Sequence, residues 1–367
     1  MKLRFVTLSP ECRNIELVKD VGQIPYMLGH SYSDIDAAIV ACDIRKDGPN
    51  IQNVAGLQLI CIKKILNSTE LTGLFYLLLN SRKIDWLSLH HAGRRSYYWT
   101  KFYKFLNPKG KVYLKLDLDF QSCDMYDSSD WERKIFEKNM GVMDLVTVET
   151  RAVKDRIQKY SCQEIQILGD GYCKTEFEPN IFQDREETFV TVGRLGTKQK
   201  ATEILLEAFA KSAKEHSWKL KLIGTIENDF QCFINDFFCK YPELKERITF
   251  EGEIKDRKKL YEEYCKAKVF VLASRWESFG IVGAEALSCG CRVVVSDKVP
   301  PAREITRDGK YGQIVPSEDV DLLCKALIKE TKERTSREDI LEIKEYADQN
   351  FSWSIICDSL HKMLIGR

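Results

Sequence analysis

The run Ser274-Arg275-Trp276-Glu277-Ser278-Phe279-Gly280-Ile281-Val282-Gly283-Ala284-Glu285-Ala286 decides how this chain is interpreted. The apolar residues 269–273 before it are typical of a buried parallel strand, and good helix formers follow it as far as Gly290. The stretch therefore predicts a strand, a loop and a helix in succession. Because Gly280 and Gly283 leave the backbone uncovered near the helix start, N–H groups without intrahelical partners can bind an anion such as a phosphate there.

Two carboxylates flank this predicted phosphate site. Glu277 lies in the loop before the helix, and Glu285 lies within the helix. Carboxylates accept hydrogen bonds from hydroxyl groups, so a site that combines them with a phosphate suits a sugar and a ribose. These residues alone leave a second explanation open, since acidic side chains near the start of a helix also complement its dipole.

The composition indicates a globular protein with two ordinary domains. The chain has 367 residues, of which 44% are hydrophobic, and 56 basic residues nearly balance 55 acidic ones. A net charge so close to zero gives no electrostatic reason to expect a nucleic-acid partner. The cysteines form no Cys-x-x-Cys pair, so we expect reduced thiols in a cytosolic protein. The longest fully apolar run, 74–79, is too short to span a membrane, and any membrane contact is expected to be peripheral.

The amino-terminal half opens as a doubly wound domain, with its first strand over 3–8. Gly22 lies in the predicted loop after it, where it either lets the backbone approach a ligand or is an ordinary loop glycine. A buried strand over 84–89 leads into His90 and His91. Because open α/β sheets bind ligands at the carboxyl ends of their strands, a histidine here is a candidate ligand contact, with a structural imidazole as the alternative.

A further strand is predicted from Lys111 to Asp119. Asp117 and Asp119 are separated by a single residue and would share one face of it. The sequence around them shows no partner ligand for a metal, so we expect a capping or acceptor-side role.

The second half of the chain carries a candidate pair of cations. We interpret the polar segment 174–187 as a linker and expect a strand from Thr188. Arg194 follows this strand, and Lys200 precedes a predicted helix over 202–213. Two fixed positive charges at these places can converge on one diphosphate. A solvated basic loop is the alternative.

Together these motifs resemble a known family. The spacing of Glu277 and Glu285 is similar to the Glu-x7-Glu signature of glycosyltransferase family four, whose members are retaining enzymes. Gly193-Arg194-Leu195, followed by Lys200, resembles the diphosphate clamp of the family. The stretch from Gly196 to Glu203, which reads Gly-Thr-Lys-Gln-Lys-Ala-Thr-Glu, resembles the family's bacterial surface-polysaccharide branch. The resemblance implies an α/β protein of the GT-B fold, in which two Rossmann-like domains face each other with the donor between them.

The resemblance also implies the domain boundaries. We expect an acceptor-side domain over 1–180 and a nucleotide-sugar-binding domain over 188–350. From Asp319, two helical stretches are predicted to run to Arg367. The segment 351–367 is expected to cross back and pack on the first domain.

Roles for individual residues follow from the family. Arg194 and Lys200 would bind the diphosphate together with backbone amides of the helix start, which belong to Phe279, Gly280, Ile281 and Val282. Glu277 would order the sugar hydroxyls, and Glu285 would hold the ribose.

Other roles are spread along the chain. The backbone at Ile254 would meet the nucleobase, and the loop that holds Gly22 would face the diphosphate and the acceptor. His91 would support the transferred sugar, with His90 as the neighbouring alternative. The chain departs from the family at two places, since Ala201 stands where many members have glycine, and Asp170-Gly171 replaces an Asn-Gly pair.

We therefore expect a retaining glycosyltransferase of the hexosyltransferase type, which moves a sugar from a nucleotide-diphospho-sugar to a glycan or lipid-linked acceptor. A UDP-sugar is the expected donor, and surface polysaccharide assembly is the expected setting. The resemblance implies no metal and no cofactor beyond the nucleotide-sugar, and a cytoplasmic protein in peripheral contact with the inner face of the membrane. A non-catalytic partner subunit of the same fold and a nucleotide-sugar epimerase stay open as alternatives. The sequence assigns neither the sugar nor the acceptor.

Overall fold

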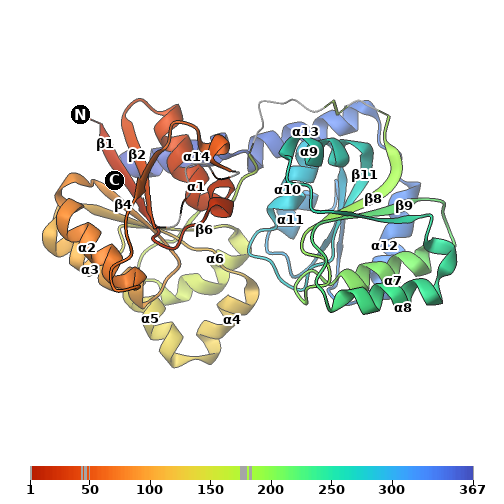
Figure 1. The fold of residues 1–367 in the computed structure, drawn as a ribbon, viewed down its shortest axis with the longest axis horizontal. Helices are drawn as coiled ribbons and strands as arrows, with labels where there is room; N and C mark the ends of the chain where they lie inside the picture. Colours follow the sequence, from red (N-terminus) through yellow and green to blue (C-terminus); the bar gives the residue numbers. More distant parts are fainter. Residues whose placement is uncertain are drawn as a thin grey trace. The chain divides into compact units, whose positions relative to one another are not determined.

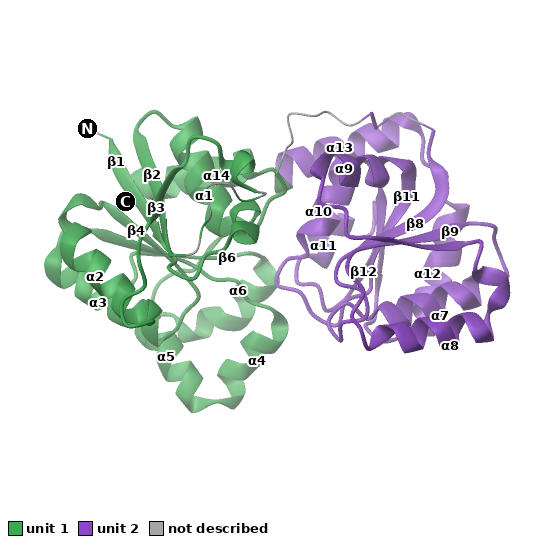
Figure 2. Ribbon diagram, in the orientation of Figure 1, with its two compact units in different colours: residues 1–173, 351–367 green, residues 174–350 purple. Residues whose placement is uncertain are grey.

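A computed structural model describes residues 2–42, 44, 48, 50–173, 180–181 and 184–366. The chain divides into two compact units (Figure 2). Unit 1 comprises residues 1–173 and 351–367, and unit 2 comprises residues 174–350. The predicted linker over 174–187 includes residues 174–179 and 182–183, which lie outside the described residues.

Unit 1 is built on a sheet of seven parallel strands in the order β3-β2-β1-β4-β5-β6-β7 (Figure 1). The strands are β1 (Leu3–Leu8), β2 (Ile35–Ala41), β3 (Gln58–Cys61), β4 (Trp86–His90), β5 (Lys111–Lys115), β6 (Leu145–Val148) and β7 (Gln166–Ile167). Its α-helices are α1 (Asp20–Ser31), α2 (Thr69–Asn80), α3 (Arg94–Leu106), α4 (Phe120–Ser128), α5 (Asp130–Met140), α6 (Arg151–Ile157) and α14 (Trp353–Ile365).

Unit 2 has a sheet of six parallel strands in the order β10-β9-β8-β11-β12-β13. The strands are β8 (Glu186–Val192), β9 (Lys219–Ile223), β10 (Ile248–Gly252), β11 (Ala267–Leu272), β12 (Arg292–Ser296) and β13 (Gly312–Val315). Its helices are α7 (Thr202–Ser212), α8 (Phe230–Lys240), α9 (Arg257–Lys266), α10 (Ile281–Ser288), α11 (Ala302–Thr306), α12 (Val320–Lys332) and α13 (Arg337–Phe351).

Both sheets reverse their strand order at one point. In unit 1 the reversal lies between β1 and β4, and in unit 2 it lies between β8 and β11. Connections on the two sides of such a point leave toward opposite faces of the sheet, which opens a crevice at the carboxyl ends of the two strands. The loops that follow β1, β4, β8 and β11 are therefore the places where each fold can hold a ligand.

The strands form because runs of apolar residues are buried on both faces of each sheet. Three consecutive valines of β12, Val293, Val294 and Val295, are fully buried. At the start of the neighbouring β13, a side chain on Gly312 would lie 1.7 Å from the Val293 carbonyl oxygen. Burial on this scale fixes the strand ends, and with them the loops of the site.

The helix α14 belongs to unit 1, although it follows unit 2 in sequence. It packs beside α1 (Figure 1), and its buried side chains include Trp353, Ile356 and Leu360. Tyr172 and Ser352 form an isolated parallel bridge where the chain returns. The prediction that the last segment crosses back to the first domain is confirmed.

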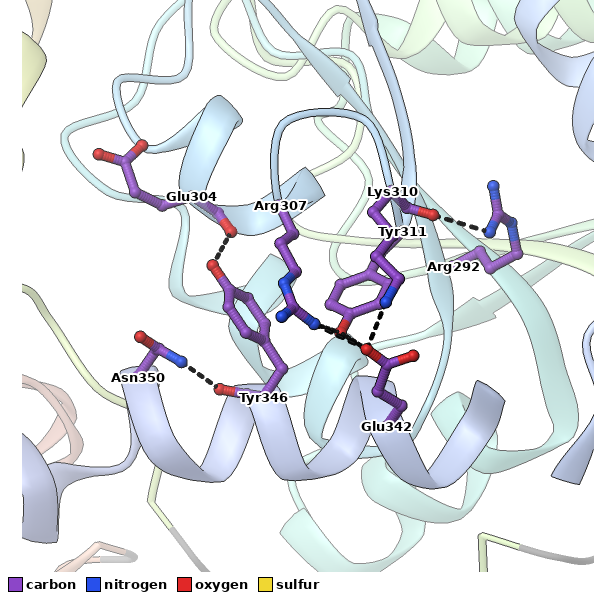
Figure 3. Close-up of polar contacts among 8 residues, drawn as sticks. All are labelled: Arg292, Glu304, Arg307, Lys310, Tyr311, Glu342, Tyr346 and Asn350. Carbon is purple, nitrogen blue, oxygen red and sulfur yellow. Dashed lines mark hydrogen bonds and ion pairs between the residues drawn. The ribbon is translucent and has the colours of Figure 1, made fainter. Parts of the chain in front are cut away.

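Three helices follow Asp319, whereas two were predicted. The stretch is interrupted at Ser352, whose extended backbone (φ −81°, ψ 139°) separates α13 from α14. Figure 3 shows how α13 contacts the rest of unit 2. Glu342 accepts hydrogen bonds from Arg307 (2.8 Å) and from the hydroxyl of Tyr311 (3.1 Å). Tyr346 donates a further one to the carbonyl oxygen of Glu304 (2.7 Å).

Candidate active site

The loops after β8 and β11 are joined to each other by hydrogen bonds. The backbone N–H of Arg275 donates to the carbonyl of Gln199 (2.8 Å), and the Gln199 side-chain amide donates to the carbonyl of Trp276 (3.1 Å). The predicted cation pair and the first predicted glutamate therefore come from one connected surface at the reversal point of the unit 2 sheet.

Glu277 is held by three donors on this surface. It pairs with the ammonium group of Lys200, accepts from the Ser274 hydroxyl (2.8 Å), and lies 3.4 Å from the Gln199 amide nitrogen. Its residue surface is 8% exposed. A carboxylate fixed in this way keeps further lone pairs for hydroxyl groups of a ligand.

Arg194 and Lys200 lie on the same loop. Arg194 is exposed directly after Gly193, and Lys200 is half-buried against that glycine. A side chain on Gly193 would lie 3.0 Å from Cε of Lys200, and one on Gly224 would lie 1.7 Å from the Gly193 carbonyl oxygen. The glycines therefore let the strand ends pack closely and leave the path of the lysine open.

The helix α10 begins at Ile281, earlier than the run of helix formers indicated. Gly280 precedes it in the left-handed conformation (φ 78°, ψ 54°) and offers no side chain to cap the helix. Such a position favours glycine because other residues are strained there. The uncapped helix start directs backbone N–H groups and the positive end of the dipole outward, as an anion site requires.

Glu285 is buried inside α10 and has two partners that the sequence analysis missed. It forms an ion pair with Arg257, and its other oxygen accepts from the hydroxyl of Tyr264 (3.2 Å). Burial works against a charged guanidinium, but the carboxylate of Glu285 raises the pKa of Arg257 above its ordinary value. Arg257 and Glu285 are 28 residues apart, so no local motif joins them.

Ile254 lies in the loop between β10 and α9. Gly252 before it is left-handed (φ 69°), and its carbonyl oxygen accepts from the N–H of Gly224 (2.8 Å). The same loop leads to Arg257, the partner of Glu285, at the start of α9. The structure thus connects the loop predicted to meet a base with the glutamate predicted to hold a ribose.

The two histidines at the end of β4 differ in their surroundings. The side chain of His90 is 7% exposed, and its Nε2 lies 3.4 Å from an oxygen of Asp20. His91 is exposed and adopts a left-handed conformation (φ 61°), with its N–H bonded to the Lys115 carbonyl (3.0 Å). Backbone strain of this kind gathers at functional positions. His91, not His90, is accessible to a ligand.

A buried charge cluster lies beside these histidines. The ammonium group of Lys115 has no exposed surface and lies 2.5 Å from Glu149 and 3.0 Å from Asp170. Burial raises the pKa of Glu149 to about 8 and that of Asp170 to about 7. Burial would also raise the pKa of Asp20, but His90 and Lys115 hold it below its ordinary value. We call Asp20, Lys115, Glu149 and Asp170 the buried cluster; of these, the sequence singled out only Asp170.

The interpretation of Gly22 as a loop residue is wrong. The helix α1 begins at Asp20, so Gly22 lies in its first turn. A Cβ atom there would lie 2.4 Å from Cα of Leu17. The glycine therefore lets α1 pack closely against the backbone that precedes it.

The strand predicted from Lys111 to Asp119 is shorter than expected, whereas the predicted capping role is confirmed for Asp119. The strand β5 ends at Lys115, so Asp117 and Asp119 lie beyond it, and Asp119 caps α4 by accepting from the N–H of Ser122 (2.7 Å). In the described part of the chain, no group of three or more His, Cys, Asp and Glu side chains is arranged to hold a metal. None of the described helices has the length and apolar character of a membrane span.

Comparison with known proteins shows a similarity of unit 2 to one family. Residues 174–347 match the model of the family described as glycosyl transferases group 1. The match covers nearly all of unit 2, which is therefore similar to this family. The predicted resemblance is thereby confirmed at the level of the family.

Two curated relatives align with part of the chain. An uncharacterized glycosyltransferase of Methanocaldococcus jannaschii is 32% identical over 148 residues, which cover 36% of each protein. A phosphatidyl-myo-inositol mannosyltransferase of Mycobacterium leprae is 30% identical over 125 residues, or 33% of this chain and 32% of the relative. The chain thus spans about a third of the length of these relatives.

The fold extends over the whole chain. The Anabaena HepE protein, solved in complex with UDP, superposes with a TM-score of 0.73 over 100% of both chains at 15% identity. Likeness at this identity establishes the fold alone. The prediction of a GT-B fold with two Rossmann-like domains is confirmed.

Proposed function

We propose that this protein is a retaining glycosyltransferase that takes a sugar from a nucleotide-diphospho-sugar, with UDP as the nucleotide. The contact between Lys200 and Glu277, beside the uncapped start of α10, carries the proposal. It sets a cation, a carboxylate and a helix start without a side-chain cap at the reversal point of one sheet. That combination fits a diphosphate joined to a hydroxyl-rich group.

The chemical task is to stabilise the departing diphosphate. The bond between the anomeric carbon and the phosphate oxygen breaks, and the acceptor oxygen bonds to that carbon on the same face. The acceptor's proton passes to the leaving phosphate, so no side chain is needed as a covalent nucleophile. Arg194, Lys200 and the amides of Phe279, Gly280, Ile281 and Val282 would stabilise the charge that grows on the diphosphate. With these donors present, a divalent metal is not required.

Carboxylates would orient the rest of the donor. Glu277 would order the sugar hydroxyls, and Glu285, fixed by Arg257 and Tyr264, would hold the ribose. The backbone at Ile254 would meet the base. In unit 1 we assign the sugar contact to exposed His91, because His90 is turned to Asp20.

The acceptor is proposed to be a glycan or a lipid-linked glycan in surface polysaccharide assembly, with the protein at the inner face of the membrane. A phosphatidyl-myo-inositol mannosyltransferase among the relatives supports this class of acceptor.

Donor binding tests the proposal. Binding and slow hydrolysis are measured for UDP-, GDP- and ADP-sugars without metal, on the wild type and on Lys200→Ala, Glu285→Ala and Lys198→Ala. We expect one donor to bind, with affinity reduced roughly tenfold or more in the first two variants. Lys198→Ala is the matched control, because its exposed lysine precedes Lys200 on the same loop.

Two other outcomes would contradict the proposal. Absence of donor binding, or binding that is unchanged in Lys200→Ala and Glu285→Ala, would favour a non-catalytic partner subunit. Conversion of the donor to an epimer without any acceptor would favour an epimerase, and product analysis with and without acceptor detects it.

A further inference from the structure

The helix α2 of unit 1 is apolar on two sides. Its buried face consists of Thr72, Gly73, Tyr76 and Leu77. Its outward face carries Leu71, Phe75, Leu78 and Leu79, whose exposed fractions are 42%, 51%, 55% and 61%. These four positions recur at the spacing of a single helical stripe. A helix that is apolar all round is normally covered on all sides, so the outward stripe calls for an external partner.

A groove runs beside the stripe. Its volume is about 570 Å³, and Phe75 and Leu79 of α2 form one wall. Ile60 of β3, with Ile62 and Ile65 beyond it, also lines the groove. Because β3 is the edge strand of the unit 1 sheet, the groove lies between a sheet edge and a helix. The stripe and the groove together form one apolar surface, which we call the α2 surface. The position of α2 beside α3 is seen in Figure 1.

Positive charge surrounds the α2 surface. Four exposed basic residues flank the helix in sequence, namely Lys63, Lys64, Arg82 and Lys83. Two of them, Lys63 and Lys83, line the groove. Glu70 is the sole acidic residue between positions 58 and 84. This segment is therefore basic within a chain whose net charge is only +1.

We propose that the α2 surface docks on an anionic lipid bilayer. The stripe of Leu71, Phe75, Leu78 and Leu79 enters the boundary between headgroups and acyl chains, and the basic residues meet the lipid phosphates. An apolar helix face flanked by lysine and arginine is the combination that such an interface binds. A second copy of the chain is a poorer partner, because a symmetric contact would bring the same lysines together. The proposal deepens the membrane contact of the proposed function, but its test involves no sugar chemistry.

Vesicle binding of the full chain tests the proposal. Co-sedimentation is measured with vesicles of phosphatidylcholine alone and of phosphatidylcholine mixed with phosphatidylglycerol. We expect binding to the mixed vesicles that weakens as salt is raised. Phe75→Ser combined with Leu79→Ser, and Lys63→Glu combined with Lys83→Glu, are each expected to weaken it roughly tenfold or more.

Matched variants in unit 2 serve as controls. Leu341→Ser removes a leucine that is 41% exposed on α13, and Lys245→Glu reverses an exposed charge. Both are expected to leave vesicle binding unchanged. UDP binding is measured on every variant and is expected to stay at the wild-type level, so that loss of docking is separated from loss of the nucleotide site or of the fold.

Three results would overturn the proposal. The first is a wild-type protein that ignores anionic vesicles while it binds UDP. The second is an equal loss of vesicle binding in the unit 2 controls. The third is self-association in sedimentation velocity that disappears in the Phe75→Ser, Leu79→Ser variant, which would identify the α2 surface as an interface between copies.

Discussion

The two units place charge at their strand ends in different ways. In unit 2, Lys200 faces one carboxylate, Glu277, and keeps 18% of its side chain exposed. In unit 1, Lys115 is fully enclosed with both Glu149 and Asp170. In a partly exposed ion pair, one side chain can leave the other and bind a ligand at a small cost in free energy. Buried carboxylates around one ammonium group can neither separate from it nor be solvated. We therefore propose that ion pairs of one chemical type serve binding in unit 2 and architecture in unit 1.

The largest effect is expected for Lys115→Met. The substitution leaves Glu149 and Asp170 buried without their cation, and removing one partner of a buried pair costs about 3–5 kcal/mol. Urea denaturation at about pH 9, above the pKa of both carboxyl groups in the native protein, measures the free energy of unfolding.

Lys200→Met is the matched change in unit 2. We expect a loss of only about 1 kcal/mol, because Glu277 keeps its contacts with Ser274 and Gln199, although donor binding is weakened. Equal losses of stability in Lys115→Met and Lys200→Met would contradict the inference that the two ion pairs differ in their contribution to the fold.

An intermediate effect is expected for Arg257→Met. Glu285 would keep its bond to Tyr264 but lose its cation, and a hydrogen bond to a charged group contributes about 1.5–3 kcal/mol. Chemical denaturation gives the loss, and Arg257→Lys, which restores the charge, should recover part of it. A loss as large as that of Lys115→Met would show that partial exposure does not soften such pairs.

The buried cluster also predicts a dependence of stability on pH. Native Asp170 keeps its proton up to a pKa of about 7, whereas in the unfolded chain it ionises near its ordinary value of 3.8. Between these values the native state binds more protons, so the free energy of unfolding falls as pH rises. Because the pKa of Glu149 is raised to about 8, the free energy of unfolding continues to fall up to that pH.

Asp170→Asn removes one of these protons. The slope of the unfolding free energy between pH 5 and 7 should become shallower by up to about 1.4 kcal/mol per pH unit. Thermal denaturation across this range measures the slope. Asp119→Asn, at a helix cap outside the cluster, is the control and should leave the slope unchanged. An unchanged slope in Asp170→Asn would refute the raised pKa of Asp170 in the native cluster.

The smallest effect is expected at the start of α7. Ala201 is fully buried in the left-handed conformation (φ 49°), which strains any residue with a side chain. Ala201→Gly should therefore stabilise the protein by up to about 1 kcal/mol. Ala208→Gly, inside the same helix, should destabilise it by about the same amount, and thermal denaturation distinguishes the two signs. A loss of stability in Ala201→Gly would mean that the methyl contact outweighs the strain.

The sequence pointed to the contacts at the strand ends of unit 2 but not to the buried cluster of unit 1. Lys200 and Glu277 lie 77 residues apart and follow different strands, so they were grouped through motifs that resemble one family and not through spacing. Lys115 ends β5 and Asp170 follows β7, and no motif marks their contact, which arises only from the sheet order. Spacing along the chain carries no information about that contact.

The mistaken interpretations have the same origin. Gly22 follows a strand, as a ligand loop would, but its lack of a side chain serves the approach of α1 to Leu17. The break between α13 and α14 rests on the backbone of Ser352 at the point where the chain changes units. Both features depend on contacts between segments, which helix propensity alone does not encode.

The position of α14 has a consequence for how the protein is made. Phe5, Ile24 and Leu28, near the beginning of the chain, share a core cluster with Trp353 and Leu360. These first residues leave the ribosome long before α14 is translated, and all of unit 2 is synthesised in between. Unit 2 can therefore fold while unit 1 still exposes an apolar surface, so nascent unit 1 is the part of the protein that a chaperone would protect.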